Sequence, residues 1–126
     1  MTDVRDALKE SPFACDMGAI EPEKRGVHLT TISQLFQKVL SVRELNNGYA
    51  FQLPGEPGAL VHAAEFIELE RLCCPFFGFN LEVEAEGGSL WLSLTGRPGV
   101  KPFILAEIGE HLDAPLVKPE GLRRKD

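Results

Sequence analysis

Residues 48–58, GYAFQLPGEPG, and residues 89–99, SLWLSLTGRPG, share one pattern that determines the expected fold. In each stretch, alternating apolar residues lead into Gly-x-Pro-Gly, at 55–58 and again at 96–99, an offset of 41 residues (96 − 55). Alternation with a period of two is typical of a half-buried strand. Proline suits the first turn of a helix, where its missing N–H is not needed. Each stretch therefore predicts a strand, a tight break and a helix.

A second strand precedes each of these stretches. Residues 41–45 form the first, and Asn46-Asn47-Gly48 is a strong hairpin signal because Asn and Gly tolerate positive φ. Residues 79–85 form the second, followed by a turn at Gly87-Gly88. The pattern thus predicts a duplicated ββα unit, at 41–74 and 79–113, within a single domain that covers residues 1–126.

A leading helix is expected at residues 21–40, with Pro22 near its start and an apolar stripe that includes Leu35 and Phe36. The predicted fold class is α+β: a four-stranded antiparallel sheet with helices on one face, preceded by this extra helix. Trp91 falls on the opposite face, which predicts cover by the leading helix or by a second subunit in a homodimer, through the sheet face or edge. Residues 1–20 are expected to be irregular and 114–126 to form a tail.

Composition limits the partners. The net charge of −6 argues against nucleic acid, because phosphate binding needs clustered Lys and Arg, and the one such cluster is Arg123-Arg124-Lys125 in the predicted tail. No apolar run approaches the roughly 20 residues that span a bilayer. The charged N-terminus lacks the apolar stretch of a signal peptide, so we expect a cytoplasmic protein whose thiols are reduced.

The chemistry is expected at Cys73 and Cys74, which stand at the end of the second helix, predicted at 57–73. Pro75 should end that helix, since the residue before a proline avoids the α conformation. Glu70 precedes the two thiols by three and four residues, so all three lie on one side of the helix. Cys15 lies in a non-periodic, partly apolar stretch and is free to fold over the helix end.

Three thiols point to a soft ligand. Cys15, Cys73 and Cys74 form a zinc site only with a fourth ligand, for which His28 on the leading helix is the candidate. Without it, three thiolates suit softer ions such as Cu(I), Hg(II) or As(III). Glu70 is expected to support the metal ligands without binding the ion itself, or to accept a proton from a thiol. The predicted function is binding of a soft metal ion or thiol-reactive ligand, which the residues favour over catalysis.

Two alternatives stay open at this stage. Buried cysteine packs like a small hydrophobic residue, so the thiols could belong to the core of a dimeric interaction or structural domain. The other alternative is a thiol oxidoreductase, which needs a thiol with a pKa well below about 8.5. A helix C-terminus and a carboxylate both raise the pKa of a thiol, so the sequence argues against this last class.

The run Glu70-Arg71-Leu72-Cys73-Cys74-Pro75-Phe76-Phe77 resembles the central motif of a family of small, uncharacterised bacterial proteins. The stretches 15–17, 47–49 and 94–96 are similar to that family as well, so the resemblance covers roughly residues 13–112. It implies that Cys15, Cys73, Cys74 and Glu70 belong to one site, and it implies no substrate.

Overall fold

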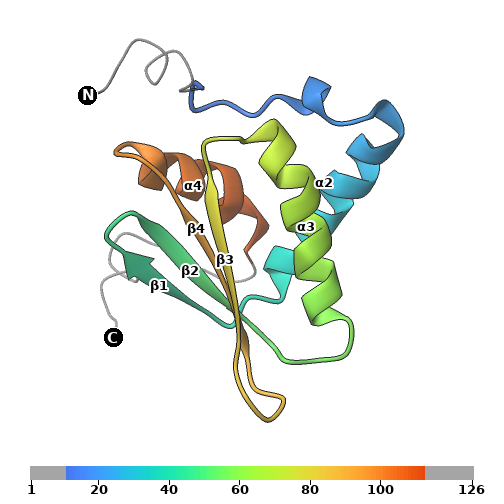
Figure 1. The fold of residues 1–126 in the computed structure, drawn as a ribbon, viewed down its shortest axis with the longest axis vertical. Coiled ribbons are helices and arrows are strands. Elements are labelled where there is room, and N and C mark those ends of the chain that lie inside the picture. The colour runs from blue at the N-terminus through green and yellow to red at the C-terminus, as the bar shows by residue number, and fades with distance from the viewer. Residues whose placement is uncertain (1–10, 113–126) are drawn as a thin grey trace, which may run out of the picture.

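The computed structural model describes residues 11–112 as a four-stranded antiparallel sheet with a layer of helices (Figure 1). In chain order, the elements are the 3-10 turn η1 (Met17–Ala19), α2 (Pro22–Gln37), β1 (Ser41–Leu45), β2 (Gly48–Leu53), α3 (Ala59–Cys73), β3 (Gly78–Val83), β4 (Leu90–Thr95), α4 (Val100–Ile108) and the 3-10 turn η2 (Gly109–His111). The predicted α+β class, with a leading helix before two ββα units, is confirmed.

The sheet joins the two hairpins through their second strands. The strand order is β1-β2-β4-β3, and every neighbouring pair is antiparallel. Phe51 on β2 pairs with Leu92 on β4. These two residues occupy equivalent positions in the repeat, so the two units are related by an approximate two-fold axis through this pair. The β3–β4 hairpin extends beyond the helices in Figure 1, where Val83 is exposed.

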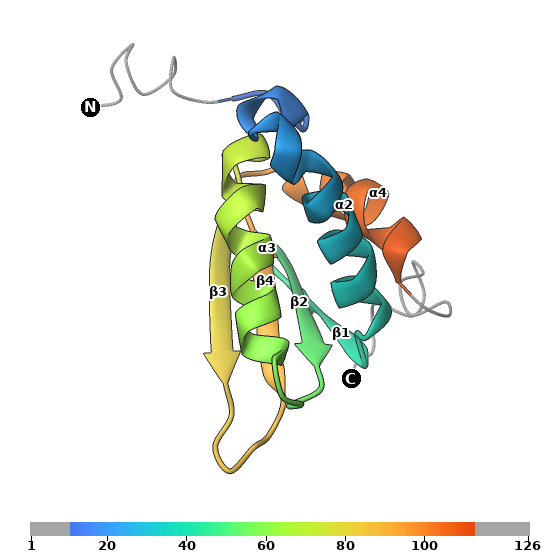
Figure 2. The same cartoon turned by 90° about the vertical axis from the view of Figure 1, so that its right-hand side faces the viewer.

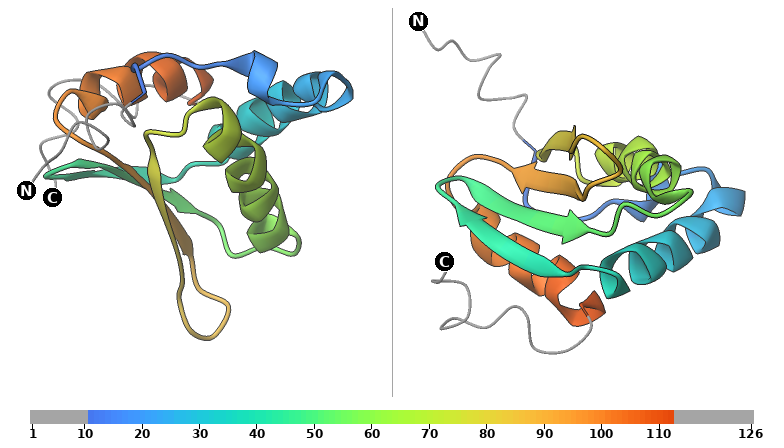
Figure 3. Two further views of the ribbon diagram at one scale, coloured as in Figure 1. Left: turned by 45° about the horizontal axis from the view of Figure 1, so that its top comes forward. Right: turned by 90° about the horizontal axis from the view of Figure 1, so that it is seen from below.

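The helices cover one face of the sheet. Figure 2 shows α2 and α3 side by side and antiparallel, with α4 beyond them, and Figure 3 shows the N-terminal segment crossing α4 and the end of α3. The alternate strand residues that face the helices form one core with them. Its most deeply buried large side chains are Ile20, Leu35, Phe36, Phe51, Leu53, Phe66, Leu92, Leu94, Ile104 and Ile108.

The hairpin at Asn46-Asn47-Gly48 is confirmed, but for a reason other than the expected one. Asn46, Asn47 and Gly48 all have negative φ. Among residues 11–112, positive φ occurs at Gly58, Glu86, Gly87 and Gly99. Glycine is needed at position 48 because a Cβ there would collide with the backbone oxygen of Leu94 on β4. Gly58 and Gly99 do adopt left-handed φ, of 84° and 102°, immediately before α3 and α4.

Trp91 lies on the face of the sheet opposite the helices, so the leading helix does not cover it, and cover by a second subunit stays a prediction. The guanidinium of Arg43 on β1 lies 4.1 Å from the Trp91 ring centre, and the Trp91 indole N–H donates to Glu84 at 3.2 Å. Within the chain, the cover comes from β1 of the same sheet, since Arg43 projects from the same face as Trp91, two strands away. A homodimer through the sheet face or edge stays a prediction that no longer draws support from Trp91.

Element boundaries shift by a few residues. Pro57 and Pro98 lie before their helices, because the left-handed glycines that follow them occupy the N-cap positions. The irregular N-terminal segment contains the turn η1. The start of the predicted 1–20 segment and the 114–126 tail, with Arg123-Arg124-Lys125, lie outside the described residues. Of the helices described, none combines the length and apolar character needed to cross a membrane.

Candidate metal site

The site starts at the end of α3. Cys73 is the last helical residue, and Cys74 leaves the helix at φ −128°, as expected for the residue before Pro75. Their sulfur atoms lie 3.8 Å apart and both thiols are free. Cys73 is 1% exposed and Cys74 is fully buried, so the two thiols point into the protein.

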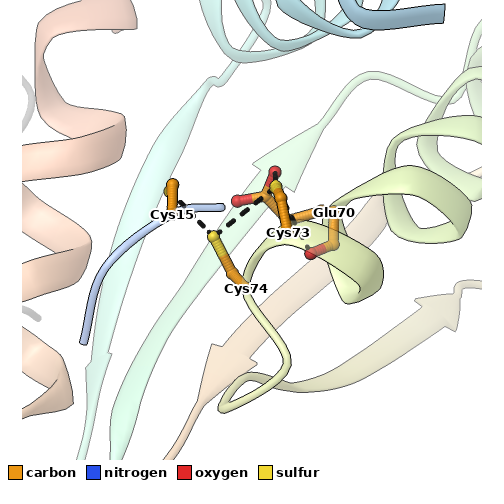
Figure 4. A group of neighbouring side chains, drawn as sticks. All are labelled: Cys15, Glu70, Cys73 and Cys74. Carbon is orange, nitrogen blue, oxygen red and sulfur yellow. Dashed lines mark hydrogen bonds between the residues drawn. The ribbon is translucent and has the colours of Figure 1, made fainter. Parts of the chain in front are cut away.

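Cys15 reaches this helix end from a distant part of the sequence. The backbone N–H of Asp16 donates to the carbonyl oxygen of Cys73 at 2.9 Å, which satisfies one of the free carbonyls at the C-terminus of α3. This bond lays residues 11–16 across the helix end (Figure 4), and the Cys15 sulfur lies 2.9 Å from that of Cys74. The predicted fold-over of Cys15 is confirmed.

Aromatic packing anchors the Cys15 segment. The Phe13 ring meets Phe76 edge-on, with ring centres 5.1 Å apart, and stacks on Phe103 of α4 at 6.3 Å. The Arg97 guanidinium lies 4.1 Å from the Phe13 ring centre and donates to the backbone oxygen of Ser11. These contacts hold the segment in place at Phe13 and at Ser11, two and four residues before Cys15.

Glu70 forms a buried pair with His28. The Glu70 Oε1 and His28 Nε2 atoms are 2.8 Å apart, and both side chains are fully buried. The His28 ring also stacks on Phe66, with centres 6.0 Å apart. Two buried polar atoms have no hydrogen-bond partner here, Glu70 Oε2 and His28 Nδ1. An unpaired buried carboxylate oxygen is rare, because it loses water without replacement, and it is an observation that a bound ligand would explain.

These side chains form a group that could hold a metal ion. Cys15, Glu70, Cys73 and Cys74 each offer a ligand atom, and all four atoms lie within 4.8 Å of one another (Figure 4). His28 lies outside the group, behind Glu70. The sequence suggested His28 as fourth ligand and Glu70 as the supporting residue; in the structure Glu70 lies within the group and His28 contacts Glu70.

One of the two sulfur separations matches that expected around a shared ion. Metal–sulfur bonds of about 2.3 Å in tetrahedral geometry place two sulfur atoms about 3.8 Å apart. The Cys73–Cys74 separation of 3.8 Å matches this value, and the Cys15–Cys74 separation of 2.9 Å is shorter. An outward shift of the Cys15 sulfur by about 1 Å would complete the arrangement.

Glu107 on α4 is a site residue that the sequence reasoning missed. The Cys15 thiol donates to Glu107 Oε2 at 3.0 Å, and the Glu107 side chain is half-buried. Its signal was available, since Glu107 directly precedes Ile108, one of the inward residues of α4, so it flanks the apolar face of that helix. A carboxylate at the edge of such a face needs a partner.

The thiols differ in their acidity. Hydrogen bonds from Cys15 and Cys74 lower the pKa of Cys73 to about 5, whereas the pKa of Cys74 is raised by its hydrogen bonds to Cys15 and Cys73 and by burial. The pKa of Cys15 is raised, chiefly by its interaction with Cys73. Burial raises the pKa of Glu107 to about 7.

The expectation of uniformly raised thiol pKa values is therefore wrong for Cys73. A hydrogen bond donated to a thiolate stabilises it, and here the interactions with Cys15 and Cys74 outweigh burial and Glu70. The cluster as a whole gives up its first proton easily and holds the other two.

A surface cavity leads to the site. It measures about 380 Å³ and opens between the Cys15 segment and the end of α3. Its lining residues are Ser11, Pro12, Ala14, Cys15, Asp16, Leu72, Cys73 and Pro75. Cys15, which is partly exposed, can therefore be reached from outside; Cys73 also lines the cavity but is 1% exposed, and Cys74 does not line it.

Comparison with known proteins found no matching family model, no matching curated protein and no matching solved structure. The functional argument accordingly depends on the geometry and chemistry of the site.

Proposed function

We propose that this protein binds a soft, thiophilic ion through Cys15, Cys73 and Cys74. The observation that carries the proposal is the convergence of three free thiols from segments 59 residues apart, with the Cys15 sulfur 2.9 Å from that of Cys74. Core packing alone needs no such convergence, since a small apolar residue at position 15 would fill the same space.

The surroundings favour a cation. The helix C-terminus, Glu70 and Glu107 all contribute negative charge or dipole, and within residues 11–112 no Lys or Arg side chain forms a hydrogen bond or ion pair with the thiols or with these carboxylates. With no Lys or Arg of the described residues paired to it, the site would gain from a bound cation, which offsets the repulsion among its own negative groups.

The donor set favours a soft ion over a hard one. Thiolates select Cu(I) and, by the same chemistry, Hg(II) or As(III), while oxygen donors select Mg²⁺ or Ca²⁺. Glu70 is close enough to the thiols to supply a fourth, oxygen ligand, which would also admit Zn²⁺. His28 would then fix the orientation of Glu70 through Oε1, as supporting residues of metal ligands usually do.

The test is direct titration of the reduced protein with arsenite, Hg(II), Cu(I) and Zn²⁺, read by native mass spectrometry and calorimetry. One ion per chain is expected, with the soft ions bound more tightly than Zn²⁺. Replacing Cys15, Cys73 or Cys74 singly by Ser should weaken binding by more than about 100-fold, since even supporting residues of metal sites contribute 10–100-fold. No uptake of any of these ions would refute the proposal.

The core-packing alternative makes a different prediction for the same variants. If Cys73 and Cys74 only fill the core, replacing both by Ala changes the free energy of unfolding and leaves no binding to lose. The two effects separate cleanly when stability and ion binding are measured on one preparation.

The thiol oxidoreductase alternative gains one observation, the lowered pKa of Cys73. Against it, the Cys73 side chain is 1% exposed, and a reactive thiol normally meets its substrate at the surface. Alkylation of Cys73 by a small reagent over a range of pH separates these cases: rapid modification near pH 7 would favour an oxidoreductase.

A further inference from the structure

The cavity beside the thiols is larger than an inorganic ion requires. A water-sized oxygen ligand occupies about 30 Å³, so an arsenic atom with three hydroxyl groups fills a minor part of it. The cavity volume of about 380 Å³ lies in the range of small-molecule sites, about 300–1,000 Å³.

The lining shows what the excess space would accept. Pro12, Ala14, Leu72 and Pro75 form apolar walls. Asp16 is the charged residue at the rim, and its Oδ1 is fixed by the backbone N–H of Gly18 at 3.0 Å. An uncharged organic group fits this lining, because it removes apolar surface from water and meets no like charge. An anionic group would meet the Asp16 carboxylate.

The three cysteines do not border this cavity equally. Cys15 and Cys73 line it, whereas Cys74 is fully buried and does not. A ligand that enters here therefore meets two thiols first. A trivalent arsenic atom that carries one organic substituent needs only two thiols, and its substituent stays on the side of the cavity.

We propose, building on the function proposed above, that the ligand class is monoorgano-arsenic(III), R–As(OH)₂, with R in the cavity. The thiols of Cys15 and Cys73 each displace one hydroxyl group, forming two As–S bonds and releasing two water molecules. The As–C bond remains intact, and no oxidant or reductant is needed. Inorganic arsenite differs because it has three hydroxyl groups to exchange and uses Cys74 as well.

The experiment compares phenylarsine oxide, which hydrates to the phenyl member of this class, with arsenite. Affinities are measured by calorimetry on the reduced protein and two variants. Ala14→Trp, at an exposed lining position, places a large side chain in the cavity. Val61→Trp, at a 61% exposed position on α3 outside the cavity lining, is the matched control.

Ala14→Trp is expected to weaken phenylarsine oxide binding by about tenfold or more, because the phenyl ring loses its buried position, and to change arsenite binding less than about threefold. Val61→Trp should change neither affinity. A third variant, Cys74→Ala, should weaken arsenite binding by more than about 100-fold and phenylarsine oxide binding by less than about tenfold.

The outcomes separate this inference from the proposed function. Equal effects of Ala14→Trp on both compounds, or equal effects of Cys74→Ala on both, would overturn the organic-ligand inference and leave thiophilic ion binding intact. Failure of the unmodified protein to bind either compound, together with no uptake of Hg(II) or Cu(I), would remove both.

Discussion

The buried pair of His28 and Glu70 offers the sharpest test of the packing described above. Both side chains are fully buried and share a 2.8 Å contact between Nε2 and Oε1. Replacing His28 alone by Leu leaves the Glu70 carboxyl group without this partner in an apolar surrounding. Replacing Glu70 alone by Leu strands both ring nitrogens of His28, since Nδ1 already has no partner.

Each single replacement is expected to lower the free energy of unfolding by about 3 kcal/mol, at the lower end of the cost of breaking a buried pair. That corresponds to a fall in Tm of about 10–15 °C for a domain of this size. The double replacement by Leu removes both polar groups and fills a similar volume, so it should lie within about 1 kcal/mol of the unmodified protein. Additive single effects would instead give a loss of about 6 kcal/mol.

The assay is urea unfolding followed by circular dichroism, on reduced protein with a chelator present so that no bound ion contributes. Ser41→Ala is the control, since it removes the partly buried 2.7 Å hydrogen bond to Gln52 and should cost about 1 kcal/mol or less. A double variant as unstable as the sum of the single variants would refute the pairing of His28 with Glu70.

Three further predictions follow from the site and its supports. Thiolate absorbance should show one thiol titrating near pH 5 and the other two above pH 9, and Cys73→Ser should abolish the low step; three thiols titrating together would contradict this. Because the pKa of Glu107 is raised from 4.5 to about 7, its contribution to the free energy of unfolding falls as the pH rises between these values. The free energy of unfolding measured across this range should therefore decline less in Glu107→Gln than in the unmodified protein. In chemical unfolding, Gly99→Ala should lower the free energy of unfolding by about 1 kcal/mol or more beyond the loss in Gly58→Ala. Both glycines have positive φ, but only at position 99 would a Cβ meet a side chain, the Phe13 ring at 2.8 Å. Equal losses would show that Phe13 is not held there.

Local signals in the sequence were sufficient for the secondary structure. The alternation in residues 48–53 and 90–95 predicted β2 and β4, and Pro75 predicted the end of α3 at Cys73. Such signals are reliable because backbone conformation and the pattern of buried side chains repeat over a few residues. The reason for glycine at position 48 was not predictable, since it depends on the approach of β4 from 46 residues away (94 − 48).

The sequence by itself determined the strands and helices, the ββα duplication and the place of Cys73 and Cys74 at a helix end, because each depends on neighbours within a few residues. Tertiary structure alone decided which groups meet. The contacts of Cys15 with Cys74, of Cys15 with Glu107 and of His28 with Glu70 join residues 59, 92 and 42 positions apart. No local periodicity encodes such contacts, because they depend on how the helices and the N-terminal segment pack together. For the same reason the place of Glu70 beside the thiols, its contact with His28 and the lowered pKa of Cys73 follow only from the folded chain.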